Sequence, residues 1–129
     1  MTIFRSSLIA FLMASGAFAE DVPLPSGRVA SLVETIWEPQ SVPVEIWLRL
    51  RFVVPGIGPE LDFDEVGADL LALCRTQALP ELARTGKRAD QAIVSMASEP
   101  LEFGATNPEV TQFFEAYRLS NDDCILEGF

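Results

Sequence analysis

The segment EIWLRLRFVV, residues 45–54, constrains the fold more than any other part of the sequence. Apolar side chains occupy every second position from Ile46 onwards, and Trp47, Arg49 and Arg51 alternate with them. This period of two is typical of a β-strand with one buried face and one exposed face. Such a strand needs a neighbouring strand along its edge and a second layer over its apolar face.

Other parts of the chain have the composition of strands. The segments rich in β-branched and aromatic residues are 28–38, 91–98, 110–119 and 124–129. The last two flank SNDD at 120–123, and these turn-forming residues predict a hairpin. Pro39 and Pro43 predict an irregular loop that joins the first of these strands to the alternating segment.

The clearest helix signal lies at Asp62. Asp62 and Glu65 form a D-x-x-E capping box, in which each side chain binds a free backbone N–H at the helix start. Leu61 and Val66 occupy the positions of a hydrophobic staple. The sequence therefore predicts a helix that begins just after Asp62.

The expected helix has one apolar stripe. Its members at helical spacing are Val66, Leu70, Leu73 and Cys74, followed by Gln77. Gly67 and Ala68 are small enough to let the helix approach a sheet closely. Pro80 predicts that the helix ends or kinks after Leu79, with one or two further turns before a stop at Gly86.

The expected order of elements is β-β-α-β-β-β. Strands on both sides of one helix predict an α+β fold, with an antiparallel sheet of about five strands and one main helix packed on one face. The loop at 99–109 contains proline, glycine and Asn-Pro signals and is long enough to carry a functional surface.

The N-terminus has the three parts of a secretory signal peptide. Arg5 is followed by the apolar run LIAFLMASGAF and by the small-residue cleavage site AFA at 17–19. This run is shorter than the roughly 20 residues of a transmembrane helix. We expect a signal peptide at 1–19, a flexible lead-in at 20–27 and a single domain at 28–129. The mature protein would then be periplasmic or secreted and would not be an integral membrane protein.

The net charge and the absence of histidine limit the classes of function that the protein can have. The chain carries a formal net charge of −10, which becomes −11 when Arg5 is removed with the signal peptide. Such an acidic protein repels phosphate backbones, so we expect no nucleic-acid partner and a preference for cationic ones. The chain has no histidine, which excludes Ser-His-Asp and Cys-His catalysis and histidine metal sites. We expect no cofactor.

Cys74 and Cys124 are the only two cysteines, 50 positions apart. An oxidising compartment favours a disulfide between them, and both can lie in the layer between helix and sheet. Two free buried thiols or one reactive thiol are the alternatives. The reactive thiol is disfavoured because the chain has neither a C-x-x-C motif nor a histidine to activate a thiolate.

Trp47, Arg49 and Arg51 form a candidate binding face. An aromatic ring and two guanidinium groups on one sheet face can bind a carboxylate or an acidic partner segment. The alternative is that the arginines pair across strands with acidic residues of the same chain. The expected partners were Glu34, Glu115 and Glu127.

Glu115 and Tyr117 form a candidate pocket. Both share a strand face with Phe113 and Leu119, so this acid would point towards the core if that face is buried. A buried Glu115 needs a partner, for which an arginine is the obvious choice. The acidic stretch DFDEVGAD at 62–69 lacks the calcium-ligand spacing of an EF-hand, and helix capping explains it.

Three segments carry a resemblance to a known family: PSGRVASLVETIWE, CRTQALP and TQFFEAYRLSNDDCILEGF. The chain resembles, over residues 23–129, a family of small bacterial exported proteins that is known only as a domain of unknown function. The resemblance implies one exported domain and assigns no activity, cofactor or catalytic residue.

These observations favour a non-catalytic, periplasmic module that binds a protein or a small ligand. Two alternatives stay open. One is a histidine-free enzyme, or a small-ligand pocket, that uses Glu115 with arginines. The other is a structural accessory subunit of a cell-envelope complex.

Overall fold

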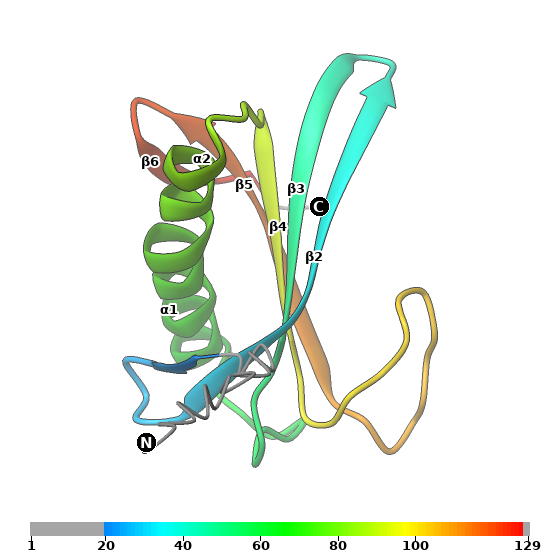
Figure 1. Ribbon diagram of the computed structural model, residues 1–129. Helices are drawn as coiled ribbons and strands as arrows, with labels where there is room; N and C mark the ends of the chain where they lie inside the picture. The colour runs from blue at the N-terminus through cyan, green and yellow to red at the C-terminus, as the bar shows by residue number, and fades with distance from the viewer. Residues whose placement is uncertain (1–19, 128–129) are drawn as a thin grey trace, which may run out of the picture.

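The computed structural model describes residues 20–127, and the expected signal peptide at 1–19 lies outside this range. A six-stranded sheet packs one face against a single long helical segment (Figure 1). The strands, in their order across the sheet, are β1 (Asp21–Pro23), β2 (Val29–Ser41), β3 (Val44–Val53), β4 (Gln91–Ala97), β5 (Gln112–Ser120) and β6 (Asp123–Leu126). The helical segment comprises α1 (Phe63–Leu73), a π-helical turn (Cys74–Ala78) and α2 (Leu79–Thr85).

The core lies between α1 and the sheet. The apolar positions of the alternating segment are buried, with Leu48, Leu50 and Phe52 at most 1% exposed. Val66 and Leu70 of the helix stripe pack in the same core. The predicted sheet-dominated α+β class is therefore confirmed.

The predicted all-antiparallel sheet is wrong at one pair, because β3 and β4 run parallel. The helical segment that connects them carries the chain back along the sheet, so β4 starts at the same end as β3. The other four strand pairs are antiparallel.

The expected count of about five strands is also wrong, because residues 20–27 are not simply a flexible lead-in. Asp21–Pro23 pairs with β2 as the short edge strand β1. The strand β2 continues through Pro39, which the sequence predicted to be a breaker. Beyond Ser31, β2 is itself a sheet edge, and a proline without an N–H is tolerated there.

Pro80 does not end the helical segment. The chain widens into a π-helical turn, in which the Leu79 N–H donates to the Cys74 carbonyl, and Pro80 then occupies the first turn of α2. Proline is tolerated there because the first turn of a helix needs no intrahelical N–H. Gly86 caps α2 in the left-handed conformation, as the sequence predicted.

The two ends of α1 are fixed differently. Asp62 is the N-cap of α1 and accepts a hydrogen bond from the Asp64 N–H. Glu65, the expected second half of the capping box, instead pairs with Arg28 at 2.8 Å. At the other end, a disulfide joins Cys74 to Cys124 of β6, with their Cα atoms 6.3 Å apart.

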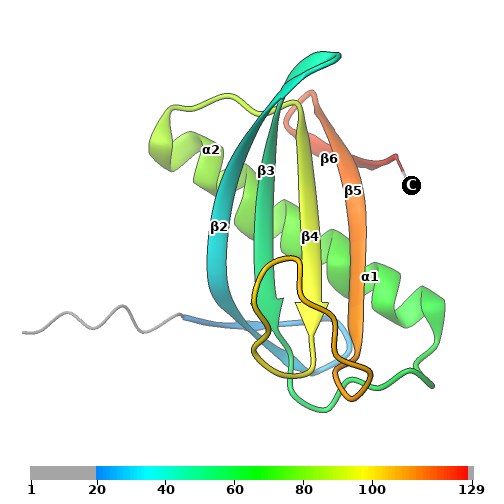
Figure 2. The ribbon, with the colours of Figure 1, turned by 90° about the vertical axis from the view of Figure 1, so that its right-hand side faces the viewer.

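The loop between β4 and β5, residues 98–111, lies over the face of the sheet opposite the helix. Figure 2 shows this loop crossing in front of the strands while α1 and α2 lie behind them. The hairpin turn between β5 and β6 places Asn121 and Asp122 at positive φ, which is the geometry that these residue types favour.

Candidate functional site

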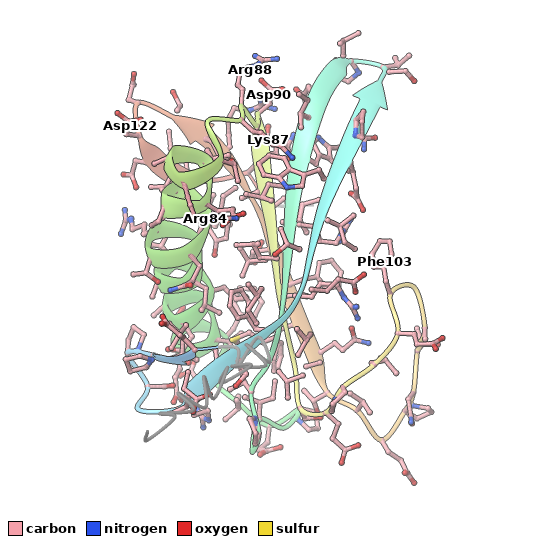
Figure 3. The ribbon with its side chains drawn as sticks, in the orientation of Figure 1. Arg84, Lys87, Arg88, Asp90, Phe103 and Asp122 are labelled. Atoms are coloured by element: carbon pink, nitrogen blue, oxygen red, sulfur yellow. A yellow bond between two sulfur atoms is a disulfide. The ribbon has the colours of Figure 1, made fainter. Side chains whose placement is uncertain are left out.

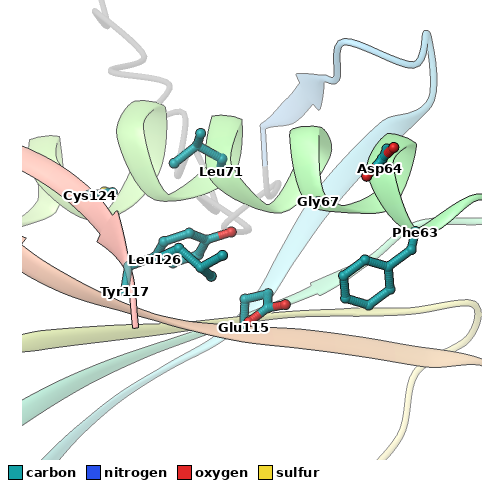
Figure 4. A pocket seen from close by; sticks show the side chains of 8 residues that line it. All are labelled: Phe63, Asp64, Gly67, Leu71, Glu115, Tyr117, Cys124 and Leu126. Carbon is teal, nitrogen blue, oxygen red and sulfur yellow. The ribbon is translucent and has the colours of Figure 1, made fainter. Parts of the chain in front are cut away.

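A cavity of about 310 Å³ lies between α1 and the β5–β6 edge of the sheet (Figure 4). Its lining combines acidic, aromatic and aliphatic side chains with Cys124, one of the two cysteines of the disulfide. The lining residues are Phe63, Asp64, Gly67, Leu71, Glu115, Tyr117, Cys124 and Leu126.

The helix side of the cavity follows from one glycine. Phe63, Gly67 and Leu71 are four residues apart and therefore lie on one face of α1. A Cβ atom built on Gly67 has nothing within 4 Å, so the missing side chain leaves open space between its two neighbours. The sequence predicted a close helix–sheet approach at this glycine, and the structure has a cavity there instead.

The sheet side of the cavity comes from β5 and β6. Glu115 and Tyr117 share the helix-facing side of β5, and Leu126 of β6 is the register partner of Tyr117. Glu115 and Tyr117, the pair that the sequence placed in a candidate pocket, therefore both line this cavity. No arginine lines it, although the sequence analysis expected one beside Glu115.

Tyr117 is only 2% exposed. Among residues 20–127 no hydrogen bond is made by its hydroxyl, which Figure 4 shows pointing towards the Glu115 end of the cavity. Burial, reinforced by the negative charge of Glu115 and opposed by Arg75, raises the pKa of Tyr117 above its usual value of 10.0. The phenol therefore stays protonated and can both donate and accept a hydrogen bond.

The cavity carries uncompensated negative charge. Within residues 20–127, neither Glu115 nor the side chain of Asp64 makes an ion pair or a hydrogen bond. All seven arginines in the described part of the chain already pair with other carboxylates: Arg28, Arg49, Arg51, Arg75, Arg84, Arg88 and Arg118. The acids of the cavity are thus left without an arginine partner from residues 20–127.

A model of DUF6497, a family of unknown function, matches residues 8–129. The chain belongs to DUF6497. Searches of curated proteins and of solved structures find no match. The family resemblance inferred from the sequence is therefore confirmed, and the family assigns no activity to the cavity.

In this DUF6497 protein the expected binding face exists but its charges are already paired. Arg49 donates two hydrogen bonds to Glu38, at 3.0 and 3.2 Å, and Arg51 pairs with Glu34. Trp47 Nε1 donates to Glu45 at 3.1 Å. Of the three glutamates that the sequence suggested as partners of these arginines, only Glu34 pairs with one of them.

The loop at 98–111 also covers these arginines. Figure 3 labels Phe103 on this loop. Its ring lies 4.9 Å from the Arg49 guanidinium carbon and 5.6 Å from that of Arg51. Arg51 also donates a hydrogen bond to the Leu101 carbonyl oxygen. Both guanidinium groups are therefore engaged by the protein itself, and the hollow of about 240 Å³ that they line with Phe103 offers an acidic ligand no unpaired arginine.

Two further searches concern the described part of the DUF6497 chain alone. Residues 20–127 contain no group of three or more side chains placed to hold a metal ion. None of their helices is long and apolar enough to cross a membrane.

The sequence analysis missed the helix side of the site. Neither Phe63 nor Asp64 was predicted to be a site residue, and the acidic stretch that contains both was explained by helix capping alone. The available signal was the spacing of Phe63, Gly67 and Leu71, in which a glycine separates two large apolar residues on one helix face.

Proposed function

We propose that this protein is a non-catalytic, exported binding domain whose ligand site is the cavity between α1 and β5–β6. One observation carries the proposal: Tyr117 is only 2% exposed as a residue, its hydroxyl makes no hydrogen bond within residues 20–127, and that hydroxyl still has access to the cavity that it lines. Buried polar atoms in proteins nearly always have hydrogen-bond partners, and this hydroxyl can take its partner only from the cavity. A bound ligand would supply one.

The shape and composition of the cavity support a small ligand. A volume of about 310 Å³ is at the lower end of the range typical of small-molecule sites. Apolar walls with a few polar groups are typical of such sites, and here Phe63, Leu71 and Leu126 surround Tyr117 and Glu115. Phe63 and Leu126 are 73% and 62% exposed, so they flank the mouth of the cavity.

Binding is favoured over catalysis for two reasons. The enzyme alternative relied on Glu115 with arginines, and no arginine lines the cavity. Tyr117 is held protonated by its raised pKa, so it would not serve as a phenolate base at neutral pH.

Export is supported by the sequence and by the disulfide. The N-terminal pattern at 1–19 is that of a signal peptide. Disulfides persist in oxidising compartments, and the Cys74–Cys124 bond fits that environment.

A fragment screen tests the proposal. Ligand-observed NMR with the mature protein should detect fragments that bind the wild type and lose binding to Gly67→Phe. The phenylalanine would fill the cavity, and the open space around Gly67 should allow the variant to fold. Circular dichroism and a thermal melt would verify the fold.

Gly67→Ala is the matched control, because it changes the same residue but leaves most of the cavity open. Its binding should equal that of the wild type. The proposal is wrong if a folded Gly67→Phe protein binds the same fragments as the wild type, or if no fragment binds the wild type at all.

A further inference from the structure

The two acidic side chains of the cavity come from opposite walls. Glu115 projects from β5 on the sheet side, and Asp64 lies in the first turn of α1 on the helix side (Figure 4). Phe63, Leu71 and Leu126 form apolar surface between and beside them. A ligand in this space would meet the Glu115 carboxylate and a hydrocarbon wall, with the exposed Asp64 at the rim.

We infer that the ligand of this cavity is a protonated amine carried on an apolar chain. The inference rests on the proposed function and specifies its ligand class. The ammonium group would donate to Glu115, and the Tyr117 hydroxyl oxygen can accept a second of its three hydrogens. The apolar chain would lie against Leu71 and Leu126.

Other ligand classes fit less well. A carboxylate or phosphate ligand would face Glu115 and Asp64 without any cationic side chain in the lining. An uncharged alcohol could bond to Tyr117 but would gain no charge-assisted hydrogen bond from Glu115. The overall net charge of −10 further favours the approach of cations.

Three probes of equal chain length test the charge preference directly. Hexylamine, hexanol and hexanoate are titrated into the isotopically labelled mature protein at pH 7 and low salt, and NMR shifts give the dissociation constants. Hexylamine should bind about tenfold more tightly than hexanol, since hydrogen bonds to charged groups are about twice as strong as neutral ones. Hexanoate should not bind.

Two variants that each remove one negative charge test whether the preference for hexylamine arises in the cavity. Glu115→Gln should weaken hexylamine binding about tenfold and leave hexanol binding unchanged. Glu109→Gln makes the same charge change on the exposed 98–111 loop, across the sheet from the cavity, and should leave both unchanged. Higher salt should weaken hexylamine binding to the wild type and have little effect on hexanol.

The outcomes separate this inference from the proposed function. Equal binding of hexanol and hexylamine in the cavity would overturn the amine assignment and preserve a cavity-binding protein. Equal losses in Glu115→Gln and Glu109→Gln would also overturn it, because only overall charge would then matter. Absence of binding by all three probes would overturn the amine assignment, whereas the proposed function would still stand or fall on the fragment screen.

A lysine-like probe distinguishes two sources of the same chemistry. Nα-acetyl-lysine methylamide presents the ammonium and its aliphatic chain as a protein side chain would. Binding of this probe together with hexylamine supports the amine assignment and extends it to a lysine of a partner. Binding of hexylamine alone supports a free amine.

Discussion

Asp69 is the only charged residue that is buried among residues 20–127. It is 2% exposed and accepts hydrogen bonds from both the backbone N–H and the hydroxyl of Ser26. These bonds attach the turn between β1 and β2 to α1. They were not foreseen from the sequence, because Asp69 and Ser26 are 43 positions apart and no local pattern links them.

Asp69→Ala should therefore lower the free energy of unfolding by about 2–3 kcal/mol, since hydrogen bonds to charged groups contribute more than neutral ones. Ser26→Ala removes only the hydroxyl bond and should cost about 1 kcal/mol. Urea unfolding of both single variants and of the double variant measures the coupling. A double variant whose loss equals the sum of the two single losses would contradict a direct interaction.

Glu45 should make the stability of the fold depend on pH in the acidic range. The hydrogen bond from Trp47 lowers the pKa of Glu45 below its usual 4.5; burial opposes this, and Arg118 and Gln91 add to it. Because the pKa of Glu45 is lower in the folded state, its ionised carboxylate stabilises the fold. This contribution to the free energy of unfolding is complete above about pH 4.5 and is lost as the pH falls through the lowered pKa.

Thermal melts between pH 7 and pH 3 test this effect. Glu45→Gln should lose less stability than the wild type below pH 4.5, because the variant lacks the group that takes up the proton. Glu109→Gln, an exposed control with the same charge change, should follow the wild-type curve. Parallel curves for wild type and Glu45→Gln would show that this carboxylate does not contribute.

At the scale of elements, α1 carries a glycine that its own packing does not require. Gly67 is helical, and an added Cβ would meet nothing within 4 Å. Glycine inside a helix costs about 0.5–1 kcal/mol relative to alanine. Retention of this glycine is consistent with a need for open space beside Phe63 and Leu71.

Gly67→Ala should accordingly raise the free energy of unfolding by about 0.5–1 kcal/mol, measured by urea denaturation. A clear loss of stability would indicate close packing at this position, which was the expectation from the sequence. It would also contradict the open helix face described above.

Individual elements were predictable where one local signal dominates. The alternation around Leu48 and Leu50, the N-cap at Asp62 and the turn at 120–123 all follow from short-range patterns. The strand β1 was missed because three residues, one of them a proline, carry no periodicity. The turns between Pro80 and Gly86 were predicted, but the π-helical turn before Pro80 was missed because such a turn leaves no clear sequence signal.

At the scale of the whole molecule, the strand order depends on contacts that no local pattern encodes. Strands on either side of a helix are compatible with both antiparallel and parallel neighbours, and here β3 and β4 are adjacent and parallel. Half of the site was predictable, since strand parity placed Glu115 and Tyr117 together. The half on α1 was not predictable, because it depends on how the helix lies over the sheet.

The disulfide closes the largest covalent loop of the fold and links α1 and its π-helical turn to the last strand. Its sequence separation of 50 residues corresponds to about 4 kcal/mol in the chain-entropy model. The double variant Cys74→Ser, Cys124→Ser should therefore lose about that much stability in urea. Intact mass measurement without reductant should find no free thiol in the wild type, and two free thiols would contradict the bond.

The central claim is that the cavity between α1 and β5–β6 is the ligand site. Backbone amide NMR shifts of the mature protein, mapped during a hexylamine titration, test it most directly. The account predicts that the largest changes fall at Gly67, Leu71, Glu115, Tyr117 and Leu126. Changes centred instead on Arg49, Arg51 and the 98–111 loop would contradict it, whereas the absence of any change would overturn only the amine assignment.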